Sequence, residues 1–382
     1  MTNNNHKRPH IPTNIQFKLW LAAGGRCEFP GCNEIVYRDG LTLKEVNWSN
    51  IAHIISWSPD GPRGHPTLSK KLAKEFSNLM LMCSKHAHLI DVEFYVTEYP
   101  VEKLRLIKQE HERRIEILTS VTSEAKTHAI VIQSNIGNTP VEVNLKEIYL
   151  AITENRMYPS NVDPFLIDLT GDSGRGNEEF YKVKASEISI RVKAFLDVFN
   201  SASKKQHISV FPLALMPLLV HFGKELGDKH SIQLFQHHRS PSDWVWSDNE
   251  DYPEYVINTP DLLDKSSKDV FLKVSLSDYI SEDKLASLPK LNTNIYEISI
   301  PHPTTSFLIN RNQIPKYDTV YRQVLNEIQR IHGVNCQIHL LLAVPAPIAV
   351  QCGLSLLARK DPIIIVYDFD SQKKGFFKAL II

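Results

Sequence analysis

Two pairs of metal-binding residues constrain the first third of this chain more than any other feature. One pair lies in Cys27-Glu-Phe-Pro-Gly-Cys32, and the other in Cys83-Ser-Lys-His86. Two such pairs, about fifty residues apart, are the usual way in which one tetrahedral zinc ion holds a small domain together. A Pro-Gly pair provides the tight turn that aims both thiolates at one ion. The sequence therefore predicts a structural Zn²⁺ with four protein ligands and no position left open for chemistry.

Length and composition set broad limits. With 382 residues, 42% of them hydrophobic, the chain can bury a core in each of two or three domains. Its net charge is zero, but residues 1–118 carry 16 basic and 13 acidic side chains, which is compatible with a front domain that approaches phosphates. Five cysteines are too few for a disulfide framework, and the N-terminus has no apolar signal segment. We expect a reduced, cytoplasmic protein.

One apolar stretch raises the question of a membrane span. Residues 338–358 are long and apolar enough to be considered, but Pro345 and Pro347 interrupt them. The pattern favours a buried strand followed by a buried helix, and no membrane association is predicted.

A histidine and an asparagine lie between the zinc pairs. His53 stands in Ala-His-Ile, and Asn78 opens the strand-like run that ends at Cys83. With the zinc pairs, this order of residues resembles the zinc-bearing HNH (ββα-metal) endonuclease family. The resemblance implies an α+β domain over residues 1–118, with His53 as the general base that activates water against a phosphodiester. It also implies that Asn78 braces the loop that carries the base.

The same resemblance implies a second metal site for Mg²⁺ or Mn²⁺, which would stabilise the leaving 3′-oxygen. Its ligands follow the second zinc pair, four residues apart on one helix face. Asp91 matches the second of these positions, whereas Ala87 stands where the family has a histidine and offers no donor atom. Three explanations compete: an inactivating substitution, a takeover by His88, which lies about 100° away around a helix, or a domain that binds DNA without cutting it.

The remainder of the chain repeats itself at an offset of 130 residues. Residues 208–226 align with residues 338–356, and four identical residues coincide: Pro217 with Pro347, Val220 with Val350, Gly223 with Gly353, and Leu226 with Leu356. Predicted strands and helices correspond at the same offset: 165–169 with 295–300, 186–199 with 318–331, and 232–235 with 362–366. Each half reads strand, helix, strand, helix, strand, which predicts an α/β domain with mostly parallel sheets.

Two fused Rossmann-like halves behind an HNH domain resemble the HNH–SAVED effectors of CBASS antiphage defence, whose SAVED domain is similar to a fused pair of CARF modules. We therefore assign residues 119–144 to a linker and first strand, and residues 145–382 to a SAVED domain with halves at about 145–260 and 261–382. Ligands of open α/β sheets lie past the carboxyl ends of strands. The glycine-rich segment 171–177 predicts a loop. The candidate ligand-binding residues are Pro217, His238, Arg239, Trp244, Trp246, Arg311, Lys316, Pro345 and Tyr367.

The resemblance implies an endonuclease that degrades double-stranded DNA once a cyclic di- or trinucleotide binds the SAVED domain. It also implies a homo-oligomer, dimer to tetramer, that assembles on activation. Two alternatives remain at this stage: a restriction-type HNH enzyme that recognises modified DNA, and a non-catalytic zinc DNA-binding sensor in which Ala87 is the natural residue.

Overall fold

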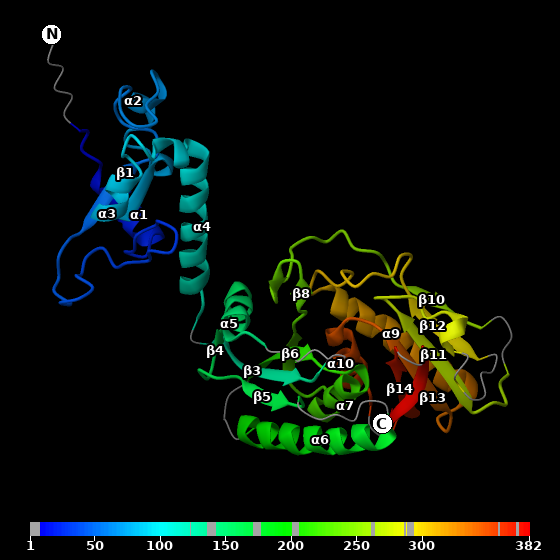
Figure 1. Ribbon diagram of the computed structural model, residues 1–382. Coiled ribbons are helices and arrows are strands. Elements are labelled where there is room, and N and C mark those ends of the chain that lie inside the picture. The colour runs from blue at the N-terminus through cyan, green and yellow to red at the C-terminus, as the bar shows by residue number, and fades with distance from the viewer. Residues whose placement is uncertain are drawn as a thin grey trace, which may run out of the picture. The chain divides into compact units, whose positions relative to one another are not determined.

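The computed structural model describes ten stretches of the chain, namely residues 8–122, 124–135, 143–170, 177–200, 206–260, 264–285, 288, 294–357, 360–371 and 374–382. The chain divides into two compact units, Met1–Thr122 and Ser123–Ile382 (Figure 1). The predicted boundary after residue 118 falls just before the end of a helix that runs to Thr119. Six residues of the predicted glycine-rich loop, 171–176, lie outside the described residues.

The N-terminal unit contains short strands and helices around a small core. Its elements are α1 (Thr13–Ala22), β1 (Ser49–His53), α2 (Leu68–Leu72), the 3₁₀ turn η1 (Phe76–Asn78), β2 (Leu79–Cys83), α3 (Ser84–Leu89), the 3₁₀ turn η2 (Val96–Glu98) and α4 (Val101–Thr119). Strand β2 is buried along its whole length, as its sequence Leu-Met-Leu-Met-Cys requires. Helix α4 contributes its periodic apolar residues Leu104 and Ile107 to the same core.

The pairing of β1 with β2 fixes the candidate site residues relative to one another. The strands are antiparallel, with Ser49 opposite Cys83 and His53 opposite Leu79. Helix α3 follows β2 without a break, so the order is strand, strand, helix. The hairpin therefore places the second zinc pair at one end and His53, next to Asn78, at the other.

The C-terminal unit contains two larger sheets. Its first part consists of β3 (Lys126–Gln133), α5 (Leu145–Glu154), β4 (Tyr158–Pro159), β5 (Phe165–Asp168), α6 (Glu178–Asn200), β6 (His207–Leu213), α7 (Met216–Leu226), β7 (Ser231–Leu234), β8 (His238–Arg239) and β9 (Ser242–Asp243). The second part consists of β10 (Val256–Asn258), β11 (Asp269–Ser275), α8 (Glu282–Leu285), β12 (Ile295–Ser299), α9 (Gln313–His332), β13 (Gln337–Ala343), α10 (Ala346–Leu354), β14 (Ile363–Asp370) and β15 (Gly375–Ile381).

Helices fill the space between the two sheets. One core joins the inner faces of both sheets to α6, α7, α9 and α10 (Figure 1). A second core lies under α5 on the outer face of the first sheet, and a third covers the outer face of the second sheet. The segment 338–358 is β13 followed by α10, as predicted, and within the described residues no helix has both the length and the apolar character to cross a membrane.

The internal repeat is visible in the sheet topology. The first sheet has the parallel order β5-β3-β6-β7, with β4 also on β3, and the second has the corresponding order β12-β11-β13-β14, with β10 and β15 added at its edges. Strand β13 spans the same residues as β6 at an offset of 130, and α10 begins 130 residues after α7. The two halves therefore share one strand order as well as one element order.

The first strand predicted within residues 119–144 is present as β3, but two boundaries lie elsewhere than predicted. Strand β3, assigned to a linker and first strand, lies at the centre of the first sheet between β5 and β6, and its counterpart β11 was not predicted. Strand β10 precedes residue 261 but pairs with β12 of the second sheet. Both differences have one cause. Which strands pair in a sheet depends on the tertiary structure, and the local composition of a strand does not indicate its partners.

The two halves meet most closely where α7 packs on α10. A Cβ atom added to Gly353 would lie 1.9 Å from the Val220 carbonyl oxygen, and one added to Gly223 would lie 2.1 Å from that of Val350. The two contacts involve corresponding residues of the two halves, because Gly353 and Val350 each lie 130 positions after Gly223 and Val220. This exchange indicates a local two-fold relation between the helices. Both glycines are required because the helix backbones touch.

Gly353→Ala is expected to destabilise the C-terminal unit by about 3 kcal/mol, because the added methyl group would meet backbone atoms of α7 that cannot move independently. Urea unfolding of the full chain measures the change. Gly40→Ala is the matched control, since a Cβ there meets nothing within 4 Å. Equal stability of the two variants would contradict the close helix contact.

Candidate metal centre, cleft and sensor residues

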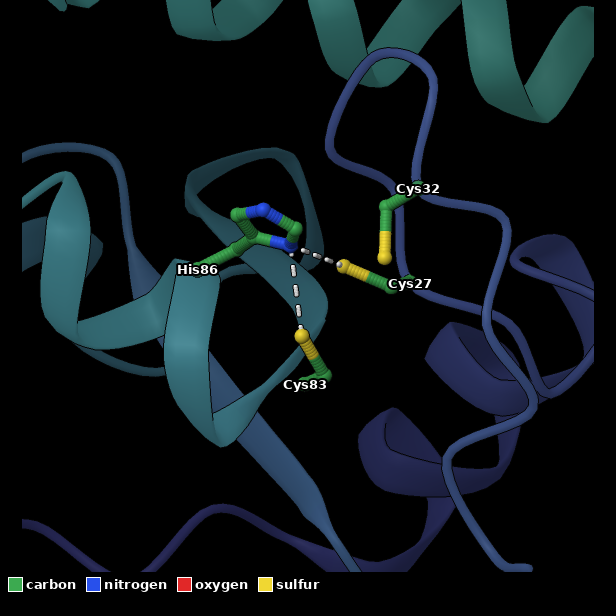
Figure 2. Close-up of side chains that lie close together, drawn as sticks. All are labelled: Cys27, Cys32, Cys83 and His86. Carbon is green, nitrogen blue, oxygen red and sulfur yellow. Dashed lines mark hydrogen bonds between the residues drawn. The ribbon is translucent and has the colours of Figure 1, made fainter. Parts of the chain in front are cut away.

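The four predicted zinc ligands come together at one point of the N-terminal unit (Figure 2). Cys27 follows two glycines in the left-handed conformation, Cys32 follows a third, Cys83 ends β2, and His86 lies on α3. Their ligand atoms all lie within 4.8 Å of one another. Figure 2 shows the three thiols and the imidazole nitrogen pointing toward a common centre.

The spacing of these atoms fits tetrahedral zinc. His86 Nδ1 lies 3.7 Å from Cys27 Sγ and 3.3 Å from Cys83 Sγ. Usual zinc–sulfur and zinc–nitrogen bond lengths would place such a pair about 3.5 Å apart around one ion. The Phe29 ring stacks on His86 with centroids 4.1 Å apart and so fixes the imidazole orientation. The donor set, three thiols and one imidazole, is that of a structural zinc site.

Burial changes the proton affinity of these ligand groups. It raises the pKa of the Cys27 and Cys32 thiols and lowers the pKa of His86. Thiolate is the form that binds metal, so ion binding at this cluster would release protons.

A cleft of about 410 Å³ lies on the same hairpin and helix. Its lining includes His53 from β1, Ala87 and His88 from α3, and Asp91 from the turn that follows. Arg8 and Trp57 also line it. The structure therefore gathers the residues predicted for chemistry into one concave surface next to the Cys/His cluster.

His53 has the environment of a neutral imidazole with one defined tautomer. It is only 6% exposed, and its Nε2 lies 3.0 Å from the Ala73 carbonyl oxygen. A carbonyl oxygen only accepts, so Nε2 carries the proton and Nδ1 keeps its lone pair. Burial lowers the pKa of His53, which keeps the ring neutral near pH 7. Nδ1 is therefore the atom that can take a proton from water.

Asn78 braces the segment that follows His53. Its Oδ1 accepts a hydrogen bond from Ile55 N at 2.8 Å, and its Nδ2 donates to Ile55 O at 2.9 Å and to Leu72 O at 3.2 Å. The side chain is buried, so these bonds replace the water it has lost. These hydrogen bonds connect Asn78 to the chain two residues after His53.

The three residues considered for a second metal are arranged differently from the sequence prediction. Helix α3 ends at Leu89, so Asp91 lies in the turn beyond it, not on the face of a helix with Ala87. His88 lines the cleft together with Ala87. The angle of about 100° between consecutive residues of a helix therefore does not remove His88 from the site. Asp91 is ion-paired with Arg63. Within the described parts of the chain, the Cys/His cluster is the one group of ligand atoms close enough to hold a metal ion.

Arg63 was missed by sequence reasoning. Its side chain is 4% exposed and lies between His53 and Asp91. The signal in the sequence was Gly61-Pro62-Arg63-Gly64, in which glycines on both sides of an arginine indicate a tight loop.

Two of the predicted sensor aromatics are core residues, which corrects their assignment as base-stacking groups. Trp244 is fully buried, with its ring edge against Phe211 at 5.3 Å between centroids. Tyr367 is buried on β14, where its hydroxyl lies 2.9 Å from His339 Nδ1. Their sequence context did not distinguish a surface aromatic from one that a sheet face covers.

The remaining sensor candidates lie at several places in the C-terminal unit. Pro345 immediately precedes α10, whereas Pro217, near the start of α7, is buried. The rings of His238 and Trp246 meet edge to face with centroids 5.9 Å apart. Arg311 donates to Asn155 Oδ1 at 3.2 Å, and Lys316 lies over the Tyr252 ring at 4.7 Å. Arg239 is exposed on β8.

The His238 and Trp246 pair has buried polar atoms without partners. His238 Nε2 and Trp246 Nε1 make no hydrogen bond within the described chain, and burial lowers the pKa of His238. Unsatisfied buried polar groups are uncommon and call for an explanation. The indole nitrogen of Trp244 is likewise buried without a hydrogen-bond partner in the described residues.

Comparisons with known proteins bear on the C-terminal unit. Residues 193–382 match the family model described as "SMODS-associated and fused to various effectors sensor domain", or SAVED. Comparison with curated proteins gives no match.

Solved structures similar to this chain include Cap4 SAVED/CARF-domain containing receptors. The Acinetobacter baumannii receptor with the cyclic trinucleotide 3′3′3′-cAAA has 8% identity and a TM-score of 0.43, covering 82% of this chain and 61% of that one. The same receptor with 2′3′3′-cAAA has 10% identity and a TM-score of 0.42, with the same coverage. The Moraxella osloensis receptor has 9% identity and a TM-score of 0.37, covering 82% of this chain and 59% of that one. The chain thus matches less than two thirds of the length of these receptors. On the family match, residues 193–382 form a SAVED sensor domain.

Proposed function

We propose that this protein senses a cyclic oligonucleotide through its SAVED domain and that its N-terminal unit is a zinc-stabilised HNH nuclease unit that the sensor controls. One observation carries the nuclease part: the Cys/His cluster, the buried His53 and the bracing Asn78 lie on one strand-strand-helix unit beside a cleft. The family match carries the sensor part.

Support for an anionic ligand comes from the repeated strand-to-helix turns. Strand β6 leads into α7 and β13 into α10, with two residues between strand and helix in each half. The first turn of a helix presents unpaired N–H groups and the positive end of its dipole to phosphates. A cyclic ligand carries a phosphate for each such turn, and the unpartnered His238 and Trp246 nitrogens offer polar groups for a base.

The nuclease chemistry is assigned to His53. In the proposed reaction, His53 Nδ1 takes a proton from a water molecule, whose oxygen attacks the phosphorus of a DNA phosphodiester. The bond from phosphorus to the 3′-oxygen breaks, and the 3′-oxygen takes a proton from solvent water. Asn78 holds the segment after the base in place. Exposed Lys70, Lys71 and Lys74, on and next to α2, provide positive charge for the DNA backbone.

The cleft as it stands does not fit a second metal ion. It offers the carboxylate of Asp91, which is already paired with Arg63, and the exposed imidazole of His88, while Ala87 offers nothing. We therefore assign no step to Mg²⁺ or Mn²⁺ in this chain and expect it to cut DNA weakly. The same observation favours one second candidate, a sensor whose N-terminal unit binds DNA without cutting it.

Binding of labelled cyclic nucleotides to the full chain tests the sensor part. The panel contains cyclic dinucleotides and the two cyclic trinucleotides carried by the Acinetobacter receptor, and light scattering of the same samples reports assembly. We expect one nucleotide to bind and to raise the molar mass from one chain to between two and four. Binding to modified DNA, with none to any nucleotide, would instead support a restriction-type enzyme.

A further inference from the structure

The segment after His53 forms a closed loop. Between Ile54 and Gly64 the chain returns on itself, with Ser56 N donating to Pro62 O at 3.2 Å and Gly64 N donating to Gly61 O at 2.9 Å. A Cβ atom on Gly64 would lie 2.1 Å from the Pro59 carbonyl oxygen. The loop is therefore packed closely against its own backbone.

Arg63 lies at the end of this loop, directly before Gly64. Its backbone has φ of 55°, a left-handed conformation that a non-glycine residue adopts at a cost. Only 4% of its side chain is exposed. The surrounding loop must hold the backbone of Arg63 in this conformation. The hydrogen bonds of the guanidinium group offset the cost.

The guanidinium group of Arg63 joins two separate parts of the candidate site. Nε donates to Ile54 O at 2.7 Å, directly after His53, and Nη1 donates to Ile90 O at 2.6 Å, directly before Asp91. Nη2 pairs with Asp91 Oδ1 and makes a longer contact of 3.5 Å with His53 O. A planar group with several fixed donors can hold the two segments at one separation, which a lysine cannot do.

Arg63 does not line the cleft, whereas His53 and Asp91, which it contacts, both do. The Asp91 side chain is 43% exposed, so its carboxylate stays accessible while one oxygen is held. The contacts of Arg63 thus connect two parts of the cleft lining, His53 at the end of β1 and Asp91 after α3.

We propose that Arg63 is the positioning residue of the nuclease site: its buried guanidinium sets the separation and orientation of His53 and Asp91. This proposal rests on the proposed function of the N-terminal unit. Arg63 touches neither substrate nor the reacting atoms, and it acts through the two residues it holds.

Cleavage kinetics provide the first test, in a parent chain that carries Ala87→His with an activating nucleotide present. Arg63→Lys should lower kcat about a hundredfold, because small misplacements of reacting groups cost that much. KM for DNA and the zinc content should change less than about threefold, because Arg63 lies outside the cleft and the Cys/His cluster. Arg114→Ala is the matched control: Arg114 lies on α4 and contacts Asn33 and His111. A fall in kcat equal to that of the control would overturn the proposal.

Amide hydrogen exchange gives a readout that does not require activity. In Arg63→Lys, the amide of Ser56 and that of Asp91, which donates to His88 O, should exchange at least about tenfold faster. The amides of β2 should keep their rates. Unchanged exchange at Ser56 and Asp91 would overturn the proposal, whatever happens to cleavage. If the parent itself never cuts DNA, the proposed nuclease function fails, and exchange still decides whether Arg63 holds the two segments.

Discussion

Cys27→Ser is expected to remove zinc from the protein and to unfold the N-terminal unit. The four ligand atoms lie within 4.8 Å of one another and join the loop after α1 to β2 and α3, so one ion would hold together segments that are far apart in the sequence. Structural zinc contributes about 10–16 kcal/mol in small zinc domains near pH 7. If removal of one thiolate releases the ion, the free energy that is lost should exceed the whole free energy of unfolding of such a unit.

Zinc content and limited proteolysis measure this effect together. The unchanged chain should hold about one zinc per molecule, and residues 8–122 should resist a protease until a chelator is added. Cys336→Ala is the matched control, because Cys336 is buried in the C-terminal unit far along the chain from the cluster. A Cys27→Ser chain that keeps its zinc and its resistance would show that the four residues do not form a metal centre.

Ala87→His is expected to produce Mg²⁺- or Mn²⁺-dependent cleavage of duplex DNA where the unchanged chain shows little. Position 87 lines the cleft together with His53, His88 and Asp91, so the new imidazole would be added where the donor set is incomplete. A bound divalent ion contributes several kcal/mol to phosphodiester cleavage. At 1.36 kcal/mol per factor of ten, the rate should rise by at least about a hundredfold.

Two further variants make that prediction specific. Ala87→Gln adds a side chain without an imidazole and should stay inactive. Adding His53→Ala to the Ala87→His chain should abolish the gained activity, because the base is lost. Equal cleavage by the Gln and His variants, or no cleavage by either with any nucleotide, would favour the DNA-binding sensor without catalysis.

The sequence predicted those features that depend on spacing along the chain. The zinc pairs, the strand and helix positions and the 130-residue repeat all follow from intervals that the fold preserves. The turns before α7 and α10 were found in this way. Gly223 and Gly353 were aligned as repeat-related residues, but their packing against the carbonyl groups of Val350 and Val220 was not predicted. Periodicity is a local property of the sequence, so it can be recognised without the tertiary structure.

Features that depend on packing were not predictable to the same degree. Trp244 is an aromatic residue in a polar stretch, and only the outer face of the first sheet determines that it is buried. Strand β3 has a β-branched sequence like many edge strands, yet it takes a central place. Arg63 reads as a surface cation, because its role depends on a left-handed backbone and on carbonyl groups that follow two different elements.

The most direct test of the account is plasmid cleavage by the Ala87→His chain with magnesium or manganese, with and without each nucleotide of the panel. The account predicts cleavage only when one particular cyclic nucleotide is present, because the SAVED domain must bind its ligand before the nuclease units can act. Cleavage at the same rate without any nucleotide would contradict control by the sensor and leave an HNH nuclease that is not gated.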